Sequence, residues 1–161
     1  MLIGFLFQLG CSREALPWVC PELRRGDLVL SEFRGDQDDG DQWFEIYNHS
    51  SAPIDLYGLR IHFTKLDGSS EMEVVIREEG YVIESGKYFV FGKYLQAEKP
   101  DFVGYGYQDD MDTNLFESAG VEIFACGIEI DQAIYRSLPS SGSLSFDGTK
   151  DLTEVTNDDE S

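Results

Sequence analysis

The sequence predicts an all-β fold of about eight strands in two packed sheets. Strand-length runs with alternating side chains recur along the chain, and the run 43–48, WFEIYN, presents two chemically different faces. The 16 glycines and the 13% aromatic content suit short strands joined by turns. We expect the apolar inner surfaces to come from the alternating residues around Trp43 and Phe89.

At 161 residues the chain fits one domain, which we place at residues 27–161. A domain of this size buries about 68–70% of the surface of its unfolded chain, so we expect it to need neither a metal ion nor a disulfide to fold.

The residues before Asp27 divide into two parts. Residues 1–10, MLIGFLFQLG, form an uncharged apolar run that is too short to span a bilayer, which takes roughly 20 such residues. The run matches the apolar region of a secretory signal, and its ending at Gln8-Leu9-Gly10-Cys11 resembles a bacterial lipobox. That resemblance implies lipidation of Cys11, with residues 11–26 as a tether; a buried N-terminal strand is the alternative.

The net charge of −19 excludes one class of partner. Nucleic-acid binding depends on Lys and Arg neutralising phosphates, and this surface repels them. It also repels anionic lipid headgroups, so contact with a membrane is expected through the lipid anchor only. The charge serves either solubility or the attraction of a cation or partner.

The predicted strands follow one another with clear turn signals between most of them. The first follows Gly26-Asp27, and the second ends at His49-Ser50-Ser51-Ala52-Pro53. Asp67-Gly68 is a strong hairpin signal, and Ser85-Gly86 and Gly127 also mark turns. The expected strand regions are 28–33, 43–48, 54–65, 71–76, 81–83, 87–92, 101–107, 120–124, 128–135 and 143–146.

Two acidic loops are the candidate contact sites for a cation or a partner. The first, residues 34–41, and the second, residues 108–114, could approach the same end of a sandwich. Carboxylates near a glycine suit calcium, although the closing acidic position of an EF-hand loop would fall on Tyr47; an ordinary solvated loop is the alternative. The candidate residues are Asp36, Asp38, Asp39, Asp41, Asp109, Asp110 and Asp112.

Several of these motifs, in this order, resemble the lamin tail domain, a family found in nuclear lamins and in many bacterial surface and secreted proteins. The resemblance runs from about Leu28 to Asp159. It rests on the Ser31-Glu32 pair, the Asp41–Ile61 stretch, the aromatic strand after Gly86 and the closing Asn157-Asp158. It implies an immunoglobulin-like β-sandwich. Many bacterial members continue to a Trp-Cys pair, so we expect the sequence given to be shortened after Ser161.

The cysteines allow two arrangements if Cys11 carries lipid. Cys20 and Cys126 can form a disulfide in an oxidising compartment. Alternatively, Cys20 pairs with a cysteine beyond Ser161, and Cys126 is a small buried hydrophobic residue. The apolar strand end around Cys126 favours the second arrangement.

No motif of catalysis is present. The sequence has no CxxC zinc pattern, Gly-rich phosphate loop, nucleophile elbow or HExxH, and its two histidines form no zinc constellation. We therefore expect a non-enzymatic binding or adhesion module without a cofactor (calcium aside), lipid-anchored in the bacterial envelope, whose partner is a protein or envelope component. The alternatives are a structural part of an envelope assembly and, less favoured, an enzyme acting on envelope polysaccharide.

Overall fold

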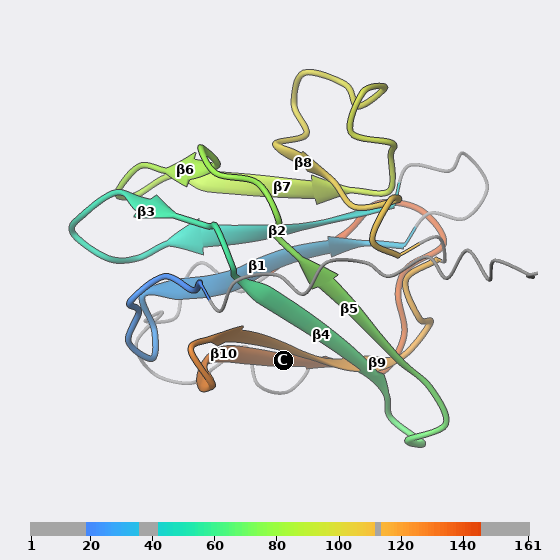
Figure 1. The fold of residues 1–161 in the computed structure, drawn as a ribbon. Helices are drawn as coiled ribbons and strands as arrows, with labels where there is room; N and C mark the ends of the chain where they lie inside the picture. Colours follow the sequence, from blue (N-terminus) through green and yellow to red (C-terminus); the bar gives the residue numbers. More distant parts are fainter. Residues whose placement is uncertain (1–18, 36–41, 112–113, 146–161) are drawn as a thin grey trace, which may run out of the picture.

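The computed structural model describes residues 19–35, 42–111 and 114–145, and this part of the chain is all-β (Figure 1). The prediction of the fold class is confirmed. Eleven strands rather than about eight occur in the described residues, because four of them are only two residues long. The strands are β1 Leu28–Arg34, β2 Trp43–Asn48, β3 Ile54–Asp55, β4 Arg60–Lys65, β5 Glu71–Val75, β6 Val82–Ile83, β7 Tyr88–Gly92, β8 Tyr105–Gly106, β9 Ala119–Ala125, β10 Ile128–Tyr135 and β11 Leu144–Ser145.

The strands form two main sheets and one small one. The five-stranded sheet has the order β11-β1-β2-β7-β8, and the four-stranded sheet has the order β10-β9-β4-β5. Only the β7–β8 pair in these sheets is parallel; β3 and β6 pair separately. Figure 1 shows β4 and β5 crossing the direction of β1 and β2, as two packed layers of twisted strands do.

Alternation of buried and outward-facing residues builds the core between the two sheets, most regularly in β2 and β9. In β2, Phe44 and Ile46 are fully buried, whereas Trp43 is half-buried on the outer face. At the start of β2, the aromatic side chain that packs into the core is therefore Phe44, and Trp43 faces outward. Phe89 lies opposite Ile46 and packs against the core, as expected.

One edge of the sandwich is closed by two facing β-bulges. The register of β1 shifts between Leu30 and Glu32, and that of β10 shifts between Glu129 and Asp131. At this point the Leu30 N–H donates to Asp131 Oδ2 at 2.8 Å, and further along the Gly26 N–H donates to the Ile130 carbonyl at 2.8 Å. The bulges thus turn two strands of different sheets toward each other.

Asn48, the last residue of β2, holds the turn that follows this strand. Its side chain is fully buried, and its amide donates to the carbonyls of Ala52 at 2.9 Å and Ile83 at 2.8 Å. Its Oδ1 accepts hydrogen bonds from the Ser50 N–H and hydroxyl. Because both N–H groups and the oxygen of this side-chain amide are used, Asn48 holds the turn after β2 against β6 with its own polar groups satisfied.

A disulfide joins Cys20 to Cys126, with 5.4 Å between the two Cα atoms. Cys126 is exposed in the two-residue β9–β10 turn with Gly127, where both residues have positive φ, 52° and 75°. This is the backbone of a tight hairpin turn. The favoured expectation of a buried, unpaired Cys126 is therefore wrong, because the apolar strand ends at Ala125 and the next residue turns outward.

Replacing both Cys20 and Cys126 by Ser should lower the free energy of unfolding by about 2–5 kcal/mol. The disulfide closes a loop with a sequence separation of 106, so it restricts the unfolded chain strongly. Urea denaturation of the variant and of the reduced wild-type protein should give the same midpoint. A double variant as stable as the oxidised protein would contradict the prediction.

Candidate functional site

The residues flanking the two acidic loops meet at one end of the sandwich. Gln42, which follows the first loop, is 1% exposed, and its Oε1 accepts a hydrogen bond from the Leu115 N–H at 2.8 Å. Its Nε2 lies 3.5 Å from the carbonyl of Gly35, on the other side of the same loop. Lys93 adds a second link, since its Nζ donates to Asn114 Oδ1 at 2.6 Å. The expectation that the loops approach the same end holds for these flanks.

Most of the candidate acidic residues belong to parts of the chain that the structure does not describe. Asp36, Asp38, Asp39, Asp41 and Asp112 lie outside the described residues, as does Cys11. Within the described ranges, no group of three or more His, Cys, Asp or Glu side chains is arranged to hold a metal ion. Calcium binding by the first loop therefore stays a prediction.

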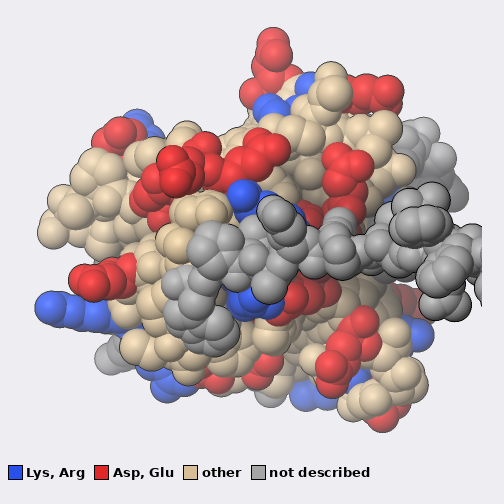
Figure 2. All heavy atoms as spheres, in the orientation of Figure 1, with Lys and Arg blue, Asp and Glu red and all other residues tan. Residues whose placement is uncertain are grey.

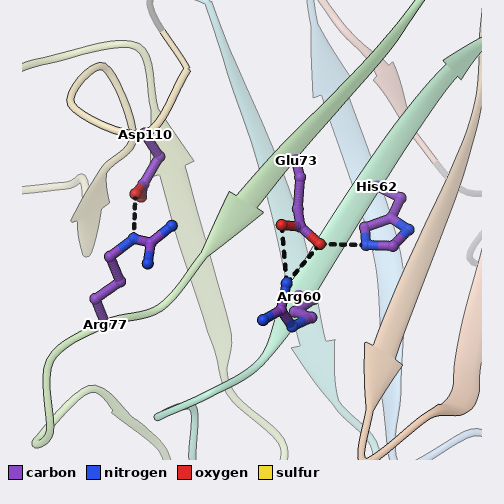
Figure 3. A network of polar contacts seen from close by, with 5 residues as sticks. All are labelled: Arg60, His62, Glu73, Arg77 and Asp110. Carbon is purple, nitrogen blue, oxygen red and sulfur yellow. Dashed lines mark hydrogen bonds and ion pairs between the residues drawn. The ribbon is translucent and has the colours of Figure 1, made fainter. Parts of the chain in front are cut away.

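Asp109 and Asp110 have different roles in the second loop. Asp109 is exposed, whereas the Asp110 side chain is 5% exposed and forms an ion pair with Arg77, with 3.0 Å between Arg77 Nε and Asp110 Oδ1 (Figure 3). Its other oxygen accepts a hydrogen bond from the Tyr105 hydroxyl at 2.6 Å. Burial and this bond to a carboxylate both raise the pKa of Tyr105. Asp110 thus lies in an internal network and not on an open contact surface.

The Ser31-Glu32 pair holds strand edges together. The Ser31 hydroxyl donates to Glu45 Oε1 at 2.8 Å, between β1 and β2, and Glu32 accepts a hydrogen bond from the Ser143 hydroxyl just before β11. Burial raises the pKa of Glu45 although the Ser31 hydrogen bond acts in the opposite direction. These contacts are structural: the two side chains link β1 to the strands on either side of it, which the sequence alone did not show.

A pocket of about 190 Å³ beside the disulfide was not predicted from the sequence. It lies on the outer face of β4 and β9, where Arg60, His62 and Phe124 are half-buried while the intervening residues are in the core. The segment Val19-Cys20 forms a second wall. Gly58 permits this arrangement: its φ is +82°, and a Cβ there would collide with the Val19 carbonyl.

Glu73 lies beside the pocket and binds two of its residues (Figure 3). The Arg60 Nη1 atom donates to both Glu73 oxygens, at 2.8 and 2.9 Å, and His62 Nε2 is 2.5 Å from Oε1. Burial raises the pKa of Glu73, but the hydrogen bonds and charges of Arg60 and His62 outweigh it, so that the pKa is lowered from 4.5. Glu73 is therefore ionised at neutral pH and fixes the orientation of Arg60.

The surrounding surface is acidic. Figure 2 shows Asp and Glu side chains in many separate groups on the face in view, with fewer Lys and Arg, in keeping with the net charge of −19. A basic residue that lines a pocket therefore differs from most of its surroundings.

Comparisons with known proteins leave the family open. No protein-family model matches the chain, and no curated protein sequence matches it. The lamin tail resemblance and the immunoglobulin-like topology that it implies therefore stay predictions.

Replacing Asp110 by Asn should lower the free energy of unfolding by about 1–3 kcal/mol, because a nearly buried, charge-assisted hydrogen-bond network loses its anion. Replacing the neighbouring exposed Asp109 by Asn should change it by less than about 0.5 kcal/mol. Urea denaturation measures both. Equal effects at the two positions would show that Asp110 has no structural role.

Proposed function

We propose that this protein is a non-catalytic binding module of the lamin tail domain type, lipid-anchored in a bacterial cell envelope on its periplasmic or cell-surface side. It recognises a protein or envelope component through the end of the sandwich that carries the two acidic loops, and it binds no nucleic acid. A lipid on Cys11 holds it to the membrane.

The observation that carries this proposal is the buried Gln42 side chain. Its Oε1 bonds to the Leu115 N–H, so the end of the first loop and the end of the second are tied to the same point of a rigid frame. Loops on such a frame supply variable contact surfaces while the sheets provide stability. Two acidic segments that end at one place favour a shared contact surface over two unrelated turns.

The disulfide between Cys20 and Cys126 supports a location in an oxidising compartment outside the cytosol. Disulfides persist in oxidising compartments and are rare in the cytosol of most organisms. Cys20 lies nine residues after Cys11, so the disulfide also anchors the segment that leads from the proposed lipid to the domain.

The loop hypothesis is tested by charge removal. Changing Asp36, Asp38, Asp39 and Asp109 together to Asn should weaken binding of the purified protein to the envelope fraction of its source bacterium about tenfold or more, because one charge-assisted hydrogen bond contributes about 1.5–3 kcal/mol. Asp110 is left unchanged because it supports the fold. Sedimentation of fluorescently labelled protein with the envelope fraction measures the affinity.

A matched control removes the same number of charges elsewhere. Glu22, Glu71, Glu79 and Glu84 are exposed and lie outside both loops, and their joint replacement by Gln should leave binding unchanged. An equal loss in both variants would show that only the overall charge matters. Unchanged binding of the loop variant would rule out the loops.

The anchor is tested by mass spectrometry of protein extracted from membranes. Cys11 should begin the mature chain and carry a diacylglyceryl group, because two membrane signals suffice for stable attachment. Among the described residues there is no helix with the length and hydropathy needed to cross a bilayer. An unmodified Cys11 within a longer chain would contradict the anchor.

A further inference from the structure

The pocket beside the disulfide is distinct from the loop end of the sandwich. The β9–β10 turn, which carries Cys126, lies at the left in Figure 1, whereas β1 ends and β2 begins at the right. The pocket is bounded by Val75, Ile76 and Phe124 from the sheet side and by Val19 and Cys20 from the N-terminal segment. Its position is fixed covalently, because the disulfide holds that segment against the β9–β10 turn.

The walls of the pocket are mostly apolar, and Arg60 supplies a positive charge among them. Arg60 and His62 are the basic side chains of the lining, and no carboxylate belongs to it in the described part of the chain. In a chain of net charge −19, this guanidinium offers an anion hydrogen-bond donors that the acidic surface otherwise lacks.

Arg60 retains donors for a ligand. Within the described residues, its recorded hydrogen bonds all come from Nη1, toward Glu73. A guanidinium has five N–H donors in a planar fork that matches a carboxylate. Glu73 pairs with Arg60 and offsets its charge, so a monoanion suits the site better than a phosphate dianion.

The volume limits the apolar part of the ligand. About 190 Å³ is below the roughly 300–1,000 Å³ of pockets for drug-sized ligands, so it suits a single ring with a short tail. Phe124 offers such a ring an aromatic partner, and Val19 and Val75 offer aliphatic contacts.

We propose that this pocket binds an aromatic monocarboxylate, with the ring against Phe124, Val19 and Val75 and the carboxylate on the guanidinium of Arg60. The shared chemistry can come from a free aromatic acid or from the C-terminal residue of a peptide. The proposal is independent of the loop end, since it involves neither acidic loop.

The test is a titration of the full chain followed by NMR. The probes are 3-phenylpropionate, as a free acid, and N-acetyl-phenylalanine, as a peptide end; N-acetyl-phenylalanine amide lacks the carboxylate. Saturable shifts should appear at Arg60, His62 and Phe124, and the amide should bind at least about tenfold more weakly, since an ionic hydrogen bond is lost. Binding of only one of the acids identifies the source of the ligand and supports the site.

Variants separate the guanidinium from general charge. Arg60→Gln and the conservative Arg60→Lys should both weaken binding, the first by about tenfold or more and the second by less. Arg25→Gln removes an equal charge from an exposed ion pair with Glu129, outside the lining, and should leave binding unchanged. Thermal melting checks that each variant is folded. The proposal is overturned if neither acid binds the wild-type protein, or if folded Arg60→Gln binds as well as wild type.

Discussion

The packing of Phe44 is the constraint on which the rest of this structure depends. Its ring stacks on Phe91 of the neighbouring strand, with 4.8 Å between centroids and an interplanar angle of 0°. It meets the edge of Phe63, from the opposite sheet, at 5.2 Å. Because all three rings are fully buried, this contact sets the distance between the sheets and the face of β2 that turns inward.

A buried polar side chain lies at each end of β2, the strand that carries Phe44. Gln42 and Asn48, which are the buried polar residues of the described part of the chain, lie just before β2 and at its last position. A buried amide must find hydrogen-bond partners, so each becomes a junction: Gln42 for the flanks of the acidic loops, and Asn48 for the turn against β6. The proposed recognition surface is thus positioned by the same strand that forms the centre of the core.

The outer face of the four-stranded sheet follows from the same alternation. Ile61 and Phe63 are in the core, so Arg60 and His62 of β4 point outward beside Phe124 of β9. On an open sheet these side chains would be solvated. Here the disulfide and the close approach allowed by Gly58 hold a second segment over them, and an ordinary sheet face becomes a pocket.

The sequence by itself determined the fold class, the longer strands and most turns, because period-two alternation and residues such as Gly68 and Gly127 act locally. Only the tertiary structure decided which strands pair, that Cys20 bonds to Cys126, that Asp110 is nearly buried while Asp109 is exposed, and that Arg60 lines a pocket. Each of these depends on contacts between residues far apart in the chain. A local pattern specifies which face a residue occupies but not which distant residue it meets there.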